Sequence, residues 1–218
     1  VMMKLLRGSG PKGLSGIPPI RDKKYIRPLI QVSKNQILDF LKNENQDFVF
    51  DSSNRDMKYL RNKVRNQLIP HLQSEYNPEF IDALDRLSSI LRQEEEFWEE
   101  KTEKAFHDCL VKTEPACIVL SKSLMKALHP ALLNRVFRKA ILKVKKNLKR
   151  ISLVHINDMA EFCFNTSSGI SLDLPGQIRI YKNKNTIIIK KEEGLLREIG
   201  KKEKKTRQRL QKKQGKES

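Results

Sequence analysis

Two short segments of this sequence carry residues that can hold a phosphate group or stabilise a negative charge. Three glycines of "LLRGSGPKGLSGIPPIR", at positions 8, 10 and 13, have the G-x-G-x-x-G spacing of a loop that cradles dinucleotide phosphates. In "KYLRNKVRNQLIP", Arg61 and Arg65 are four residues apart, and so are Asn62 and Asn66. A helix therefore places these cations and amides on one exposed side, where no acid neutralises them.

The flanks of the three glycines do not suit a dinucleotide loop. Such a loop needs a buried strand before it and a helix after it, whereas "VMMKLL" contains good helix formers and Pro18 and Pro19 follow the glycines. A Walker A loop is excluded because no Lys-Ser or Lys-Thr pair follows at the required spacing. Two interpretations stay open: a flexible basic connector, or a nest of backbone amides that holds an anion.

Composition favours a polyanionic partner. Lysine and arginine number 44 against 26 acidic residues, which gives a formal net charge of +18. Nucleic acid is the leading candidate because its phosphates release counterions when cations replace them. No apolar run is long enough to span a membrane, and three cysteines without a C-x-x-C pair predict neither a disulfide framework nor a metal site. We therefore expect a cytoplasmic protein.

The cationic segment needs neighbouring elements to position it. Ser33 and Gln36 form a capping box that predicts a helix over "KNQILDFLKNE", with Ile37, Leu38 and Leu41 as its buried stripe. The turn "DSSNRD" at residues 51–56 follows. A helix is predicted from about residue 57 to 69, and we expect Pro70 to end it.

Downstream patterns predict a mostly helical chain with a little sheet. Residues 78–112 predict a long amphipathic helix or a broken pair, and residues 122–150 contain ten cations and no acid, which predicts a basic amphipathic helix facing RNA. The alternation in "GISLDLPGQIRIYKNKNTIIIKK" predicts a small β meander. The fold class expected is α+β and mainly α-helical. Residues 195–218 form a basic tail that we expect to be disordered.

Three motifs occur in the same order as in a known family. "LLRGSGPKGLSG", "YIRPLI" and "DSSNRDMKYLRNKVRNQLIP" resemble the R-G-S-G-x-x-G-L-x-G, I-R-P-L and D-x-S-N-x-D-x-x-Y-x-R-N-x-x-R signatures of the tRNA(Ile)-lysidine synthetases. The third block is the most specific, since eight positions agree over fifteen residues. They are Asp51, Ser53, Asn54, Asp56, Tyr59, Arg61, Asn62 and Arg65.

The resemblance implies a reaction, its cofactors and its partner. In that family, ATP with Mg²⁺ activates C2 of the wobble cytidine (C34) of tRNA(Ile), and the ε-amine of L-lysine is then joined to it to form lysidine. The partner implied is tRNA(Ile), no membrane is involved, and a homodimer is compatible with the sequence. An adenylated intermediate carries phosphate charge, which fixed arginines and backbone donors can stabilise.

The resemblance also implies roles for individual residues. The expected catalytic residues are Arg61, Asn62 and Arg65, at a rim that faces the activated nucleotide or the tRNA backbone. The edge of the ATP site is expected at Arg7, Gly8, Ser9 and Gly10. Asp51 and Asn54 are expected to cap structure beside the site. The residues expected to bind tRNA are Lys58, Arg135, Arg138, Lys139, Lys145 and Lys146.

The chain departs from the family pattern in ways that matter for activity. The S-G-G-x-D-S loop that grips ATP and the acidic D-D-x-x-E-T stretch occur nowhere in these residues. Without them there is no pyrophosphate cradle and no magnesium or lysine site. We therefore expect an N-terminally truncated relative that cannot form lysidine alone.

The expected organisation has three parts. Residues 1–70 are the C-terminal remnant of an α/β PP-loop ATP-pyrophosphatase domain, residues 71–194 a helical tRNA-recognition domain that ends in the meander, and residues 195–218 the tail. Two other functions stay open. One is a noncatalytic basic RNA-binding module. The other is a tRNA thiolation enzyme, which the scattered cysteines disfavour.

Overall fold

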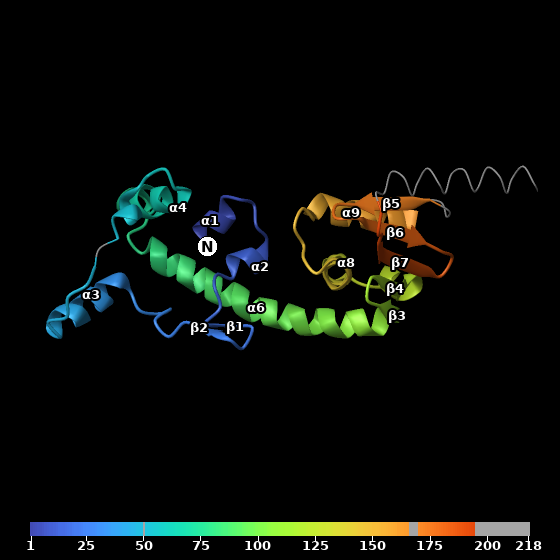
Figure 1. The fold of residues 1–218 in the computed structure, drawn as a ribbon, viewed down its shortest axis with the longest axis horizontal. Helices are drawn as coiled ribbons and strands as arrows, with labels where there is room; N and C mark the ends of the chain where they lie inside the picture. The colour runs from blue at the N-terminus through green and yellow to red at the C-terminus, as the bar shows by residue number, and fades with distance from the viewer. Residues whose placement is uncertain (50, 166–169, 195–218) are drawn as a thin grey trace, which may run out of the picture. The chain divides into compact units, whose positions relative to one another are not determined.

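The computed structural model describes residues 1–49, 51–165 and 170–194 (Figure 1). These residues divide into two compact units, one from Val1 to Phe97 and one from Trp98 onwards. The expected domain boundary near residue 70 stays a prediction, and the expected tail at 195–218 lies outside the described residues.

Short elements make up the first unit until one long helix begins. In chain order they are α1 (Met2–Leu5), α2 (Pro11–Leu14), β1 (Ile20–Arg21), β2 (Tyr25–Ile26), α3 (Lys34–Asn43), the 3-10 helix η1 (Ser52–Arg55), α4 (Leu60–Lys63), the π-helical turn η2 (Val64–Leu68), α5 (Ile69–Glu75) and α6 (Phe80–Cys109). The last twelve residues of α6 belong to the second unit. Strands β1 and β2 pair as a small antiparallel ribbon.

Helix α3 begins as its sequence predicts. The Ser33 hydroxyl accepts a hydrogen bond from the Gln36 amide at 3.2 Å, and the Gln36 side chain accepts one from the Ser33 amide at 2.8 Å. This reciprocal capping box satisfies two donors that the first turn of a helix otherwise leaves unpaired. The predicted stripe of Ile37, Leu38 and Leu41 is only half-buried, however, because it faces a cavity rather than a packed core.

The expectation that Pro70 ends its helix is wrong. The chain continues from α4 through η2 into α5, and Pro70 lies in the first turn of α5. In a regular α-helix the proline ring would clash with the carbonyl group four residues earlier. The wider π-helical turn immediately before Pro70 gives that ring space, so the helix passes through the proline.

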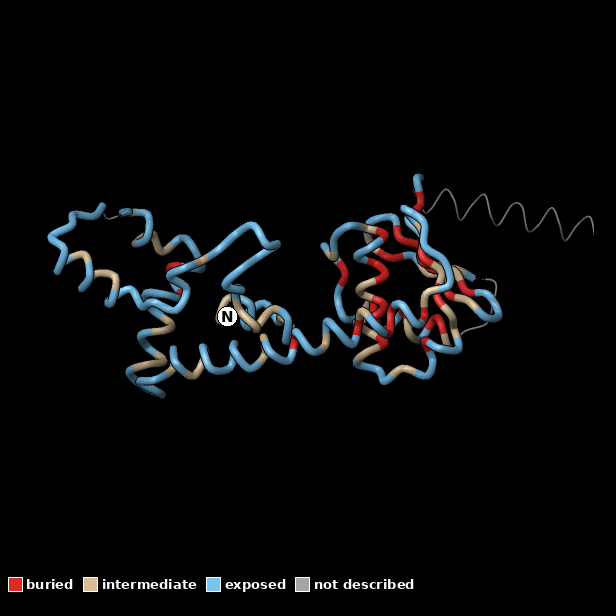
Figure 2. Tube along the Cα trace, turned by 90° about the horizontal axis from the view of Figure 1, so that it is seen from below, coloured by how far each residue is buried: buried red, intermediate tan, exposed pale blue. Residues whose placement is uncertain are grey.

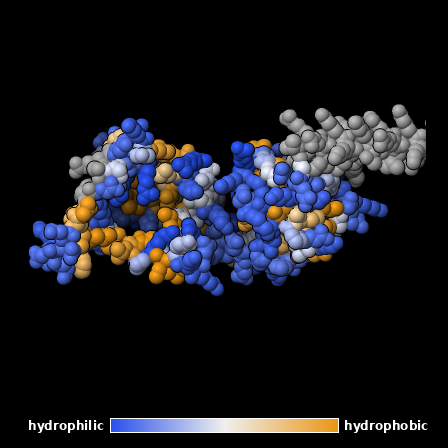
Figure 3. Space-filling view, viewed as in Figure 1, coloured by the Kyte–Doolittle hydropathy of each residue, from blue (hydrophilic) through white to orange (hydrophobic). Residues whose placement is uncertain are grey.

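The first unit has very little apolar core of its own. Val64 is the single buried hydrophobic side chain among its described residues, whereas Leu60, Ile81 and Leu87 are 43–49% exposed despite their helical spacing. Figure 2 shows few buried positions here, and Figure 3 shows apolar side chains on the visible surface of this unit. Burial of apolar side chains therefore contributes less to the stability of this unit than a packed core would.

The second unit is built on a five-stranded antiparallel sheet. Its strands are β3 (Leu110–Glu114), β4 (Cys117–Ser121), β5 (Ser171–Leu174), β6 (Ile178–Lys182) and β7 (Thr186–Lys191), in the order β3-β4-β7-β6-β5. The expected meander is β5-β6-β7. The β3-β4 hairpin was not expected, because the helix predicted to reach residue 112 ends at Cys109.

Helices α7 (Lys122–Lys126), α8 (Pro130–Lys145) and α9 (Leu153–Asn165) complete the second unit. Helix α8 contacts β4 and β7, and α9 contacts β5. Strand register aligns Ile118, Ile189 and Ile180 across the sheet, and all three are buried with Val136 and Phe137 of α8. The basic helix therefore has a core face. The fold class is α+β and mainly helical, as predicted, and within the described residues no helix could cross a membrane.

Candidate functional site

The turn at residues 51–56 is shaped by its own acidic side chains. The Asp51 carboxylate caps η1 by accepting a hydrogen bond from the Ser53 amide at 2.9 Å, and the Asp56 carboxylate accepts one from the Lys58 amide at 2.9 Å. The hydrogen bonds from Ser53 hold the pKa of Asp51 below its usual value. The capping role expected for Asp51 is what the geometry shows.

Two asparagines of the following helix grip the carbonyl groups of this turn. The Asn62 amide nitrogen donates to the Ser53 carbonyl at 2.9 Å and to the Asp56 carbonyl at 2.8 Å. The Asn66 amide nitrogen donates to the Asn54 carbonyl at 3.1 Å. Three hydrogen bonds therefore tie the turn to α4 and η2, and we call Asn62 and Asn66 the amide clamp.

The amide clamp changes the interpretation of the helical face. Asn62 is only 8% exposed, so the expectation that it lies on an open cationic face is wrong. Both hydrogens of its amide nitrogen are used by the turn, which leaves its oxygen as the free polar group. Its geometry suits a positioning residue, while the catalytic role expected for Asn62 stays a prediction.

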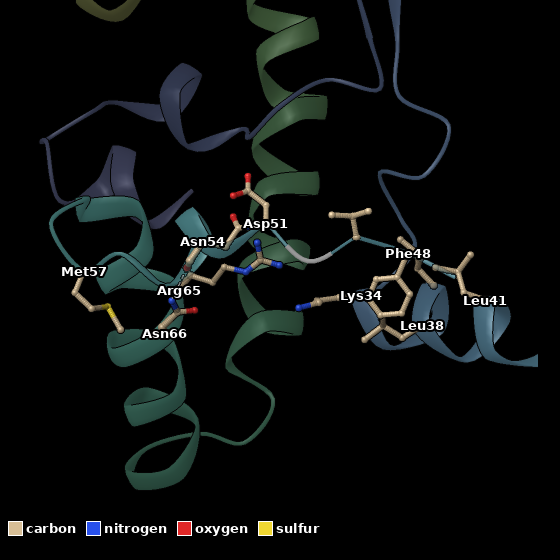
Figure 4. Close-up of a pocket in the computed structure, with 11 residues that line it drawn as sticks. Lys34, Leu38, Leu41, Phe48, Asp51, Asn54, Met57, Arg65 and Asn66 are labelled. Atoms are coloured by element: carbon tan, nitrogen blue, oxygen red, sulfur yellow. Dashed lines mark hydrogen bonds between the residues drawn. The ribbon is translucent and has the colours of Figure 1, made fainter. Parts of the chain in front are cut away.

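A cavity of about 640 Å³ opens beside the clamped turn (Figure 4). One side is apolar and comes from α3 and the segment after it, and the other side is polar and comes from the turn and η2. Its lining residues are Lys34, Ile37, Leu38, Leu41, Phe48, Val49, Asp51, Asn54, Met57, Arg65 and Asn66. Figure 4 shows Arg65 between Asp51 and Lys34, where these two sides meet.

Arg65 is the cation that projects into this cavity. Figure 4 shows its side chain extending from η2 between Asp51 and Asn54 on one side and Lys34 on the other. Within the described part of the chain its guanidinium has no hydrogen bond or ion pair. An arginine in this state presents five N–H donors to an anionic ligand. Arg61, by contrast, is exposed and does not line the cavity.

The glycine-containing turn at residues 8–10 caps the C-terminal end of helix α1. The amides of Gly8 and Ser9 donate to the carbonyl groups of Leu5 and Lys4 at 2.9 and 3.0 Å, and Gly8 has a φ of +68°. This arrangement is a Schellman motif that ends α1, for which glycine is favoured. Because two amides are already used, the turn fits the connector interpretation better than an anion nest.

These residues do not form a complete site for ATP and Mg²⁺. None of Arg7, Gly8, Ser9 and Gly10 lines the cavity, and α2, which begins after Gly10, has only four residues. In the described ranges no three His, Cys, Asp or Glu side chains gather as metal ligands. An edge of the ATP site at residues 7–10 therefore stays a prediction.

Several cations expected to bind tRNA have partners within the second unit. The Arg135 guanidinium lies 5.3 Å from the Trp98 ring centroid, and Lys139 pairs with Glu103. The Lys145 ammonium donates to the Lys149 carbonyl. Arg138 is half-exposed, and Lys58 and Lys146 are exposed. The paired cations shape the surface of α8, and their binding of tRNA stays a prediction.

Comparison with known proteins finds similarity both over the first 72 residues and over most of the chain. A family model described as a PP-loop domain, an ATP-binding family, matches residues 1–72. The tRNA(Ile)-lysidine synthase of Clostridium tetani is 31% identical over 189 residues, 87% of this chain and 40% of that protein. The enzyme of the same name from Clostridioides difficile is 31% identical over 199 residues, 91% of this chain and 43% of that protein.

Residues 1–72 are thus similar to PP-loop domains, a class of nucleotide-binding proteins. The chain as a whole is a relative of the proteins named tRNA(Ile)-lysidine synthase, as its motifs indicated. It spans about two fifths of the length of those curated relatives.

The sequence did not predict the cavity wall contributed by α3 and the segment after it. Lys34, Leu38 and Phe48 were not among the expected site residues, although all three line the cavity. Two features of the sequence could have predicted this wall. One is the apolar stripe of α3, for which no neighbouring helix in the sequence offers a matching apolar face, and the other is the apolar run "FVF" that precedes the turn. Asn66 was noticed only as part of a pattern, and its clamp bond required the structure.

Proposed function

We propose that this chain takes part in the modification of tRNA(Ile), in the ATP-dependent ligation of lysine to C2 of the wobble cytidine (C34) that forms lysidine. Its relatives carry the name of that enzyme, and its first 72 residues match a PP-loop domain. In this proposal the substrates are tRNA(Ile), ATP with Mg²⁺ and L-lysine. The chain acts in the cytoplasm, and dimerisation stays a prediction.

The proposal rests on the sequence and the conformation of residues 51–65. Its residue types match the family signature, and the amide clamp holds its turn against the helix. The turn and the helix together present Arg65 to a cavity. A preorganised cation next to a fixed turn is what stabilisation of phosphate charge requires, because no reorganisation is needed at the moment of reaction.

The chain's own residues would bind and orient the RNA. Arg65 supplies fixed positive charge at the cavity, and exposed cations such as Lys58 and Lys146 attract the phosphate backbone. ATP, when bound, supplies the activation of the base. The S-G-G-x-D-S loop does not occur in residues 1–218, so we propose that these residues alone bind tRNA and do not complete the ligation.

Two measurements on the purified chain test this proposal. Binding of tRNA(Ile) transcript is measured by filter retention at several salt concentrations, and ATP-pyrophosphate exchange is measured with tRNA and lysine present. We expect salt-dependent binding without exchange. Failure to bind tRNA(Ile) more tightly than a DNA duplex of equal length would contradict the proposed partner, and robust exchange would contradict the proposed inactivity.

A noncatalytic RNA-binding module is the second candidate. The formal charge of +18 favours it. The two candidates differ in how they respond to mutation. A simple phosphate binder loses affinity by similar amounts for any exposed cation removed, whereas in a full-length relative Arg65→Ala is expected to abolish modification and leave tRNA affinity nearly unchanged.

A further inference from the structure

We infer that the hairpin of β1 and β2 is a separate RNA-contact element, which stacks an unpaired base on Tyr25 and attracts the strand's phosphates to Lys23. We call residues 20–27 the basic ribbon (Figure 1). None of these residues lines the cavity at Arg65. The choice of RNA as the polyanion rests on the proposed function. The contact surface itself is argued from the turn of the ribbon, its two faces and its charge.

The turn of the basic ribbon holds a lysine in a conformation that suits glycine. The Lys24 amide donates to the Arg21 carbonyl at 3.1 Å, and the two residues between them, Asp22 and Lys23, have φ values of 56° and 53°. Two positive φ values across such a bond are typical of a type I′ hairpin turn, which prefers Asn-Gly or Asp-Gly. Asp22 follows this preference and Lys23 does not. The sequence therefore keeps a cation at the tip of the ribbon at a cost in backbone strain.

The two strands give the ribbon one apolar face and one face with a cation and an aromatic ring. The register pairs Ile20 with Ile26 and Arg21 with Tyr25, and directly opposite residues of an antiparallel pair project on the same side. The Arg21 guanidinium lies 4.6 Å from the centroid of the Tyr25 ring, which is 47% exposed. An exposed ring of this kind stacks on RNA bases. Bases in a duplex are already stacked on one another, so the ring suits an unpaired base.

The charge of the basic ribbon favours a polyanion. Its eight residues include four cations and one acid. The acid, Asp22, pairs with Arg21 at 3.3 Å, and the Arg27 guanidinium donates to the Pro18 carbonyl at 3.0 Å. Lys23 has no hydrogen bond or ion pair within the described part of the chain. Cations beside an exposed ring suit an RNA strand, because phosphates are attracted to the cations and bases stack on the ring.

Binding of labelled RNA to the full chain, measured by fluorescence anisotropy at about 150 mM salt, tests the inference. One probe is a ten-residue single-stranded oligouridylate, and the other is a ten-base-pair RNA duplex. Vesicles of phosphatidylcholine and phosphatidylglycerol are tested by flotation. They are included because Ile20 and Ile26, which are 60% and 72% exposed beside cations, would also suit an anionic membrane surface.

The variants separate the ring from the cation of the turn. They are Tyr25→Ala, Tyr25→Phe and Lys23→Gly. Glycine adopts a positive φ without strain, so a loss of binding in Lys23→Gly cannot come from a disrupted turn. Tyr76→Ala and Arg86→Ala are the matched controls, since both residues are exposed in the same unit and lie outside the basic ribbon.

The expected effects are confined to the basic ribbon. Tyr25→Ala weakens binding of the single strand by about fivefold or more, and Tyr25→Phe, which keeps the ring, changes it less than about twofold. Lys23→Gly weakens it by about threefold and lowers its salt dependence. The two controls change it less than about twofold, and Tyr25→Ala leaves the affinity for the duplex unchanged.

Equal losses for Tyr25→Ala and Tyr76→Ala, or equal losses of single strand and duplex in Tyr25→Ala, would overturn the inference. Vesicle binding that depends on Tyr25 and Lys23 would overturn it in favour of a membrane partner. Each of these results leaves the proposed function standing if tRNA(Ile) still binds. Conversely, ribbon-dependent binding of the oligouridylate by a chain that ignores tRNA(Ile) would remove the proposed function and keep the RNA contact. Circular dichroism checks that the variants fold, as expected for exposed positions.

Discussion

Asparagine side chains at two positions hold backbone carbonyl groups in place, and this decides what the residues around them can do. Asn62 and Asn66 have the spacing of a solvent-facing ladder, yet both bind the turn that precedes them. Arg61 and Arg65 have the same spacing, and only Arg65 reaches the cavity. Residues of the same type and spacing therefore differ in role, because the turn at residues 51–56 packs against only one side of the helix.

We expect Asn62→Ala to loosen the turn. The substitution removes two hydrogen bonds from a side chain that is 8% exposed, at a cost of about 1–2 kcal/mol. Hydrogen exchange of the Asn54 and Lys58 amides should accelerate about tenfold or more. Asn66→Ala, which removes a single exposed bond, is the control and should have a smaller effect. Unchanged exchange in Asn62→Ala would contradict the clamp.

The ion pair between Glu103 and Lys139 should make stability depend on pH. The hydrogen bond from Lys139, with smaller contributions from its charge and from Lys143 and His107, holds the pKa of Glu103 below its usual 4.5. A lowered carboxyl pKa stabilises the fold above pH 4.5, and this stabilisation is lost as the pH falls through the folded value. Because Glu103 is 46% exposed, its contribution is at most about 1 kcal/mol.

Denaturant unfolding of Glu103→Gln checks this. The variant should be less stable than the unmodified chain at pH 7, and the difference should shrink as the pH falls below 4.5 and the Glu103 carboxylate becomes protonated. A difference that does not change with pH would show that the substitution acts through packing instead of charge.

At the level of elements, the structure replaces one expected stop with a continuation and one expected continuation with a stop. The helix runs through Pro70 by way of a π turn, and α6 gives way at Cys109 to a hairpin. The hairpin strand β4 has a β-branched run, "CIVLS", that favours a strand, but only its pairing with β7 distinguishes it from a helix end.

The turn between β5 and β6 offers a test at this scale. Gly176 has a φ of +87°, and a Cβ added there would meet the Lys145 side chain. We expect Gly176→Ala to lower the free energy of unfolding by about 1–2 kcal/mol, because the left-handed conformation is strained for other residues. The next residue, Gln177, also has a positive φ of 62°. Gln177→Gly should therefore leave the free energy of unfolding unchanged or raise it. Thermal unfolding of both variants and the unmodified chain measures these differences.

For the whole molecule, the main physical contrast is between the cores of the two units. The second unit buries α8, α9 and one face of its sheet, while the described part of the first unit buries one hydrophobic side chain. Since burial of apolar surface is the largest stabilising contribution to folding, the units should differ strongly in stability.

We expect native-state hydrogen exchange to show this difference. Amides of β4, β6 and β7 should be protected by at least a hundredfold more than those of α3 and α4. Equal protection in the two units would contradict the assignment of the core to the second unit.

The sequence by itself determined the helical class, the capping box of α3, the Asp51 cap, the β5-β6-β7 meander and the resemblance to tRNA(Ile)-lysidine synthetases. These depend on periodicity, on local hydrogen bonding and on short motifs, all of which are contained in neighbouring residues. Only the tertiary structure decided that Asn62 faces the turn, that Arg65 and not Arg61 lines the cavity, and that Phe48 and Leu38 form its other side. Those outcomes depend on contacts between segments that pattern alone does not bring together.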